Sequence, residues 1–125
     1  MNGERYLLDS VILIDHLNGV DAATDFLRHA IDASSISAIT RAEVLTGLAP
    51  KDVRVGAALL GCFTLLVIDG SIADLAAKLR RTHRWRLPDA IQAAVAQHHG
   101  LLLVTRNTKD FPPARYAFVR IPYKV

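Results

Sequence analysis

The sequence has almost no cysteine and no long apolar run, and each shortage excludes a class of protein. One cysteine, Cys62, stands among 125 residues, so the chain can form neither an internal disulfide nor a cysteine-based zinc site. No apolar run reaches membrane-spanning length, and MNGERYLL at the start lacks the apolar stretch of a signal peptide. We therefore expect a soluble protein of the reducing cytoplasm.

Internal repeats, low-complexity segments, linkers and a glycine-rich phosphate loop are missing as well. Apolar residues make up 51% of the chain, which excludes wholesale disorder. The length suits one domain over residues 1–125, with enough buried surface to fold without a metal or a disulfide.

Short apolar runs alternate with segments of helical periodicity. The runs typical of strands cover 5–8, 34–37, 64–68, 101–105 and 118–121. Helices are expected over 10–18, 21–33, 40–48, 52–62, 71–84 and 88–99. This alternation predicts a three-layer α/β/α fold around a mainly parallel sheet of four or five strands. Ligands of such sheets bind beyond the carboxyl ends of the strands, so the residues that follow each strand are candidates for a site.

Three acids stand after a strand or near the start of a helix. Asp9 directly follows the first strand, Glu43 falls in the first turn of the helix expected from Thr40, and Asp89 follows Pro88 at another helix start. If these positions share one edge of the sheet, the carboxylates converge and repel one another, and such a cluster needs a cation. Hard oxygen ligands suit Mg²⁺ or Mn²⁺.

Each acid also has a structural interpretation, which the sequence leaves open. Asp9 and Asp89 can stabilise helix starts through the helix dipole. Glu43 matches a capping box with Thr40, in the pattern Thr-x-x-Glu. Another acid, Asp15, is expected on the exposed face of the first helix.

Basic residues gather at the end of the helix expected over 71–84, which opens with the capping pattern Ser71-x-x-Asp74. The chain has a net charge of +3, and its segment KLRRTHRWR contains Lys78, Arg80, Arg81, Arg84 and Arg86. Such side chains can bind phosphates, and Trp85 among them can stack on a base. The alternative is a solvated helix face whose charges favour the C-terminal end of the dipole.

Four segments in order resemble the motifs of the PIN-domain family, and within it those of VapC-type ribonuclease toxins of bacterial toxin–antitoxin pairs. They are LLDS at 7–10, ITRAEVLTGL at 39–48, LPDA at 87–90 and LVTRNTKDF at 103–111. Each motif is weak alone, but the four in order are specific and cover nearly the whole chain. The resemblance implies a compact parallel sheet flanked by helices, in agreement with the pattern above.

The resemblance also implies a metal site. Asp9, Glu43 and Asp89 match the three metal-binding acids of the family, and Ser10 matches the hydroxyl position beside the first. We expect Asp9 and Asp89 to be direct ligands. Glu43 would bind through water or act as a base for the attacking water. The family often has Thr-Asn after the first acid where this chain has Ser10-Val11, a minor departure.

Two further positions come from the last motif. Thr105 matches a hydroxyl near the metal, and Asn107 falls where many relatives have Asp or Asn as the fourth polar group. The resemblance gives Thr105 and Asn107 the role of fixing the water or the phosphate. Asn107 departs from the four-acid version of the site, which weakens a second metal position, and Asp110 nearby is a candidate to compensate.

The activity implied is Mg²⁺-dependent endoribonucleolytic hydrolysis of RNA, with Mn²⁺ as a substitute and transfer, ribosomal or messenger RNA as substrate. The basic segment would guide the RNA backbone. The implied partners are a cognate antitoxin and a second copy in a homodimer. The apolar residues of 53–63 suit the core, the dimer or the antitoxin equally well.

Two other functions compete with this one. A catalytically inactive PIN-like domain that only binds partners is the first. A receiver-like signalling module is the second, because the strand TLLVI is followed by Asp69. A receiver also needs a lysine at a later strand end, where this chain has Arg106, and an acidic pair at the first strand end, where it has only Asp9.

Overall fold

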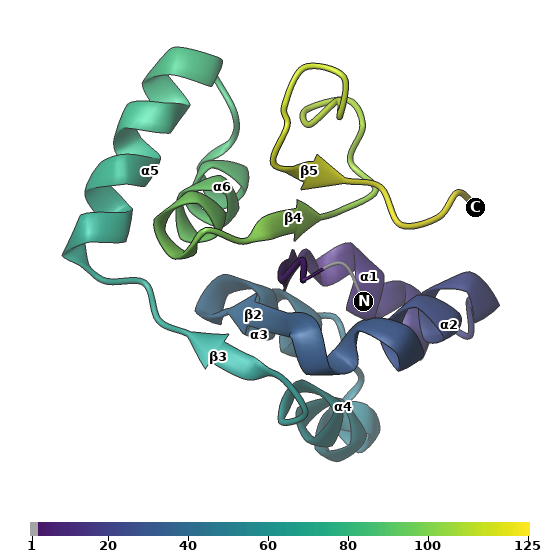
Figure 1. Cartoon of the computed structure of the whole chain (residues 1–125). Coiled ribbons are helices and arrows are strands. Elements are labelled where there is room, and N and C mark those ends of the chain that lie inside the picture. The colour runs from purple at the N-terminus through teal and green to yellow at the C-terminus, as the bar shows by residue number, and fades with distance from the viewer. Residues whose placement is uncertain (1–2) are drawn as a thin grey trace.

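Five parallel strands form the centre of the fold in a computed structural model that describes residues 3–125 (Figure 1). The strands are β1 (Tyr6–Leu8), β2 (Ser34–Ser37), β3 (Thr64–Leu66), β4 (Leu102–Val104) and β5 (Val119–Arg120). Their order in the sheet is β3-β2-β1-β4-β5, and every neighbouring pair is parallel. The first strand therefore lies in the middle, with its carboxyl end between those of β2 and β4.

Six α-helices flank this sheet. They are α1 (Ser10–Leu17), α2 (Asp21–Ala30), α3 (Ala38–Thr46), α4 (Val53–Leu60), α5 (Gly70–His83) and α6 (Leu87–His99), with short 3-10 turns at Ile31–Ala33 and Pro50–Asp52. Every predicted strand and helix is present, with each bound within three residues. Among the helices of residues 3–125, none is long and apolar enough to cross a membrane.

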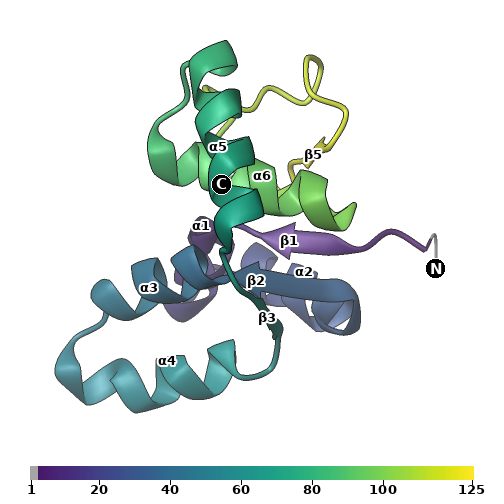
Figure 2. The ribbon, with the colours of Figure 1, turned by 90° about the vertical axis from the view of Figure 1, so that its left-hand side faces the viewer.

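Side chains of β1 point alternately into two cores, one on each face of the sheet. Leu7 packs in the core beneath α5 and α6, which includes Ala76 and Val95. Leu8 packs in the other core with Ile12 of α1 and residues of α2, α3 and α4. Figure 2 shows α5 and α6 on one side of the strands and α3 and α4 on the other. The predicted three-layer α/β/α fold is confirmed.

The start of α3 differs from the prediction. The helix begins at Ala38, and the hydroxyl oxygen of Ser37 accepts the backbone N–H of Thr40 at 3.2 Å. Thr40 is therefore inside the helix and forms no capping box with Glu43, which lies beyond the first turn. The reason is that β2 ends in a serine, whose hydroxyl oxygen caps the helix by accepting a free N–H of its first turn. The helix therefore starts two residues earlier than Thr40.

A second predicted cap is also wrong. The side chain of Asp69, not Ser71, caps α5 by accepting the backbone N–H of Ile72 at 3.0 Å. The same helix ends at Arg84, whose φ of 61° makes it the one non-glycine residue of the described chain in the left-handed region. Gly100 ends α6 in the same conformation, as predicted.

The prediction that Asp15 is exposed is wrong. Its carboxylate is buried and accepts two hydrogen bonds from Arg106, from Nε at 2.6 Å and from Nη2 at 3.1 Å. The hydroxyl of Tyr123 donates a third at 2.8 Å. Burial acts to raise the pKa of Asp15, but these donors outweigh it and lower the pKa. We call this group the clasp, because it joins α1, the segment after β4 and the C-terminal segment.

Candidate active site

Asp9 lies one residue past β1 and is held by donors from three elements. Its backbone N–H donates to the carbonyl oxygen of Val104 at 2.9 Å, which continues the pairing of β1 with β4. Its Oδ1 accepts the N–H of Ser10 at 2.8 Å, and its Oδ2 accepts the hydroxyl of Thr105 at 2.7 Å. The amide of Gln92 donates to Oδ1 at 3.4 Å. Asp9 does cap α1, but the other donors fix the direction in which its carboxylate faces.

Glu43 and Asp89 lie within electrostatic reach of Asp9. Partial desolvation raises the pKa of Glu43, and the charges of Asp9 and Asp89 raise it further, against a hydrogen bond from Ser10. Burial likewise raises the pKa of Asp89, followed by the charge of Asp9, while Arg86 lowers it. Three elements thus bring the three acids to one end of the sheet, where their charges oppose one another.

The buried oxygen of Asp89 has no hydrogen-bond donor. Among the buried side-chain nitrogen and oxygen atoms of residues 3–125, only Oδ2 of Asp89 has no hydrogen-bond partner. The nearest cation, Nε of Arg86, is 3.7 Å away on a side chain that is 83% exposed, so it forms a weak ion pair and no hydrogen bond. Such an oxygen, beside two further carboxylates, suits a cation.

The donor set fits a hard divalent ion with several bound waters. Within residues 3–125, no three His, Cys, Asp or Glu side chains come close enough together to hold a metal ion by themselves. Mg²⁺ usually keeps several waters and binds through one or two carboxylates. A site in which Asp9 and Asp89 were direct ligands and the exposed Glu43 acted through water would have this coordination.

The loop after β4 adds a fourth acid. The amide of Asn107 donates to Oδ2 of Asp110 at 2.9 Å, and its Oδ1 accepts the backbone N–H of Asp110 at 3.1 Å. The charge of Asp110 also contributes to the raised pKa of Asp89. Asn107 thus holds the loop that places Asp110 near the acids. The spacing Asn-x-x-Asp, which lets the amide close a local turn, was the sequence signal for this.

The comparisons with known proteins identify the fold family. A model described as PIN domain matches residues 6–118. The chain belongs to the PIN-domain family. It is 36% identical over 113 residues to Ribonuclease VapC10 of Mycobacterium tuberculosis (strain ATCC 25618 / H37Rv), a match that covers 85% of each chain. For such a PIN-domain relative of ribonucleases, dependence on a divalent metal ion is the general expectation.

Solved structures share the whole PIN domain. A chain of a toxin–antitoxin complex from Klebsiella pneumoniae matches with a TM-score of 0.88 and 38% identity, over 96% of this chain and 99% of that chain. FitAcB from Neisseria gonorrhoeae matches with a TM-score of 0.77 and 27% identity, over 96% and 99% of the two chains. These likenesses agree with the fold that the motif order predicted.

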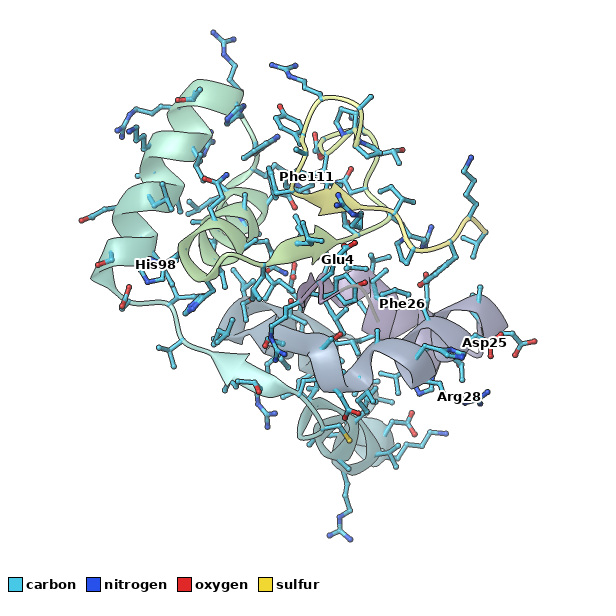
Figure 3. The ribbon with its side chains drawn as sticks, viewed as in Figure 1. Glu4, Asp25, Phe26, Arg28, His98 and Phe111 are labelled. Carbon is cyan, nitrogen blue, oxygen red and sulfur yellow. The ribbon has the colours of Figure 1, made fainter. Side chains whose placement is uncertain are left out.

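The basic residues of this PIN domain lie on its surface, but the tryptophan among them does not. The exposed set is Lys78, Arg80, Arg81, Arg84 and Arg86. Trp85 is only 3% exposed, and its Nε1 donates to the backbone oxygen of Asp110 at 3.0 Å. Its ring packs against Phe111, which Figure 3 labels, with ring centroids 4.8 Å apart. The prediction that Trp85 stacks on a base is therefore wrong, and the residue instead anchors the Asp110 loop.

Sequence reasoning missed Gln92. This side chain is 2% exposed and sits three residues after Asp89, on the same face of α6. It is a polar residue in an otherwise apolar stretch, AIQAAVA, which was the available signal. Its partners lie on β2, α3 and the end of β1, which no local pattern specifies.

Proposed function

We propose that this PIN domain is a Mg²⁺-dependent endoribonuclease and the toxin of a toxin–antitoxin pair. The observation that carries the proposal is that Asp9, Glu43 and Asp89 lie within electrostatic reach of one another and that Asp89 has a buried carboxylate oxygen without a donor. The relatives support it, because VapC10 is named a ribonuclease and the Klebsiella match is a toxin–antitoxin complex. Action on cellular RNA would take place in the cytoplasm, which is the location we propose.

The residues divide the work of hydrolysis. Asp9 and Asp89 would hold the ion, and the 2.7 Å hydrogen bond from Thr105 would keep the Asp9 carboxylate in place for it. When bound, Mg²⁺ lowers the pKa of a coordinated water and offsets negative charge on the phosphate. Glu43, whose pKa is raised, would accept the proton of the attacking water as the water oxygen bonds to phosphorus. The bond from phosphorus to the ribose oxygen then breaks, and that leaving oxygen takes a proton from solvent water.

The contacts adjust two of the roles implied by the resemblance. The Thr105 hydroxyl proton is engaged by Asp9, and the Asn107 amide is engaged by Asp110. We therefore assign Thr105 and Asn107 to orienting the acids, with Ser10 supporting Glu43 by a hydrogen bond. Asp110 completes the negative field around Asp89.

The exposed basic set, which runs from Lys78 of α5 to Arg86 at the start of α6, guides the RNA backbone toward these acids. Arg86 lies nearest, since its Nε is 3.7 Å from Oδ2 of Asp89. Contacts with phosphates carry affinity and no sequence information, so the set suits transfer, ribosomal and messenger RNA alike.

The partners in this proposal are a cognate antitoxin and a second toxin copy. An apolar groove of about 330 Å³ between α1 and the α3–α4 connection is lined in part by Leu17, Leu48 and Val55. Val55 is 65% exposed and Val53 is 38% exposed, so this edge of α4 offers apolar surface to a partner. Leu60, in contrast, belongs to the core.

The test is RNA cleavage by protein purified free of any partner. Wild type and Asp9→Asn are incubated with transfer RNA and structured RNAs in Mg²⁺, Mn²⁺ or EDTA. We expect metal-dependent cleavage by wild type and at least a hundredfold loss in Asp9→Asn, because the amide can still cap α1 but carries no charge for the ion. Gel analysis of the products gives the rates.

The matched control is Asp25→Asn, the same change on α2. Asp25 is 67% exposed and pairs only with Arg28 nearby, and Figure 3 shows both on the surface of that helix. It should cleave as wild type does. If wild type neither cleaves RNA nor binds metal by calorimetry, the protein is a partner-binding PIN domain and the proposal is wrong.

A further inference from the structure

Gln92 sits at the centre of a buried hydrogen-bond network behind the acids. Its Oε1 accepts the hydroxyl of Ser37 at 2.7 Å, and its Nε2 donates to the hydroxyl oxygen of Thr40 at 2.6 Å. The same Nε2 donates to Oδ1 of Asp9 at 3.4 Å. The Thr40 hydroxyl in turn donates to the carbonyl oxygen of Leu8 at 3.2 Å. One side chain therefore links the end of β1, the start of α3 and the middle of α6.

The protons of this network have one consistent arrangement. The oxygen of Ser37 already accepts the N–H of Thr40, so its own proton goes to Oε1 of Gln92. The Thr40 hydroxyl gives its proton to Leu8, so it needs a donor, and Nε2 supplies one. The second proton of Nε2 then faces Asp9. Only an amide, with an acceptor and two protons, satisfies all three neighbours.

This linkage joins the elements that carry all three acids. Asp9 is bonded directly, Glu43 lies one turn beyond Thr40 on α3, and Asp89 lies one turn before Gln92 on α6. Besides its bonds to Ser37 and Thr40, the buried amide of Gln92 places its second proton on a carboxylate and not on a neutral acceptor. The carboxylate is that of Asp9, whose charge also acts on Glu43 and Asp89. Through this bond, Gln92 can affect the geometry of the acidic site.

We infer that Gln92 is a positioning residue, which holds the Asp9 carboxylate and the starts of α3 and α6 in the arrangement that binds the divalent ion. The inference rests on the proposed function. Residues that orient metal ligands from behind typically change metal affinity or activity by 10- to 100-fold when they are replaced. Gln92 touches neither the ion nor the RNA in this assignment, so its loss weakens the ion site while leaving the reacting groups in place.

Two variants of the full chain test this. Gln92→Met keeps the length and removes every hydrogen bond, and Gln92→Asn keeps the amide but withdraws it by one methylene from Asp9. The control is Ser34→Ala, which removes a different buried hydrogen bond, from the Ser34 hydroxyl to the carbonyl oxygen of Ala30 at 2.7 Å. Ser34 begins β2, at the end of the strand away from the acids.

The first measurement is Mn²⁺ binding by calorimetry without RNA. We expect the dissociation constant to rise about tenfold or more in both Gln92 variants and to stay within about twofold of wild type in Ser34→Ala. The second is the cleavage rate against Mg²⁺ concentration. In the Gln92 variants the half-saturating concentration should rise by a similar factor, while the rate at saturation stays near that of wild type. A purely structural role would lower the melting temperature and leave that concentration unchanged.

The outcomes separate the inference from the function on which it rests. If wild type binds Mn²⁺ and both Gln92 variants bind it equally well, the positioning role is wrong and the proposed function stands. If Gln92→Met does not fold, Gln92→Asn alone decides by the same criterion. If wild type binds no Mn²⁺, the metal site and this inference fail together.

Discussion

At the scale of single residues, Asp89 illustrates how a binding site costs stability. Its carboxylate is mostly buried, its Oδ2 has no donor, and its charge faces that of Asp9. A buried charge without partners destabilises the folded state, and burial is the first cause of the raised pKa. A bound cation removes that penalty. In the proposed site, Asp89 would therefore oppose folding in the absence of metal and favour binding in its presence.

Asp89→Asn tests this trade-off directly. In EDTA, we expect the variant to be more stable than wild type by about 1 kcal/mol, because a neutral amide loses less hydration than a buried carboxylate. In Mn²⁺, wild type should gain stability by binding the ion and the variant should not. Equilibrium urea unfolding in both conditions measures this. A variant that is less stable in EDTA, or that gains as much from Mn²⁺ as wild type does, would contradict the assignment.

At the scale of elements, α5 presents one face to α6 and the other to solvent. Ile72 and Ala76 are buried in the core that also contains α6, while Lys78, Arg80 and Arg81 are exposed. The helix leads through Arg84 directly to the start of α6, where Arg86 and Asp89 lie. This connection continues the positive charge of α5 to Arg86, which lies beside Asp89.

Reversing two of these charges should weaken RNA binding without altering the chemistry. In Arg80→Glu/Arg81→Glu, we expect KM to rise by at least tenfold with kcat within about threefold of wild type, and the salt dependence of binding to become shallower. Arg84 is left intact because its left-handed backbone would confuse the result. Cleavage kinetics at several salt concentrations give both constants.

The matched control reverses two exposed charges on other helices, Arg28 of α2 and Arg54 of α4. Figure 3 shows α2 on the opposite side of the molecule from α5. Arg28→Glu/Arg54→Glu has the same change in net charge, so any long-range effect of charge appears in both variants. Equal losses in the two would assign the effect to net charge and remove α5 from the binding surface.

Local sequence patterns predicted most of the helices and strands correctly. The residues that were wrongly placed or missed depend on contacts with distant parts of the chain. The apolar runs located every strand, and Asp9 followed its strand as predicted, because these features depend on neighbours in sequence. Asp15 was placed on the surface because its partner Arg106 stands 91 residues away. Gln92 was missed for the same reason, since Asp9 is 83 residues distant. Trp85 appeared exposed among charged neighbours, but its packing partner Phe111 lies on another loop.

At the scale of the whole molecule, the sheet order and the clasp act on the same end of the fold. With β1 between β2 and β4, the residues that follow these three strands meet, which brings Asp9 next to Thr105. The clasp then ties the residue after Thr105, Arg106, to α1 and to Tyr123 near the C-terminus. Its bonds join residues that are 91 and 108 positions apart, so it limits how far β4 and the C-terminal segment can separate from the central strand.

Tyr123→Phe measures what the clasp contributes, through its dependence on pH. The hydroxyl donates to a charged, buried carboxylate, so its loss should lower the free energy of unfolding by about 1.5–3 kcal/mol at neutral pH. The pKa of Asp15 is lowered in the folded state, so its stabilisation is present above the ordinary pKa and is lost as the pH falls through the folded value. The gap between wild type and variant should therefore shrink on acidification below about pH 4.

Urea unfolding from neutral pH down to about pH 3 follows that gap. The comparison is Tyr116→Phe, whose hydroxyl lies 3.4 Å from Nδ1 of His83 and contacts no carboxylate. Its difference from wild type should stay constant over the range in which Asp15 titrates, because the Tyr116 hydroxyl makes no contact with that carboxylate. A Tyr123→Phe gap that is equally independent of pH would mean that the hydroxyl contributes by packing, and the clasp would then hold through Arg106 alone.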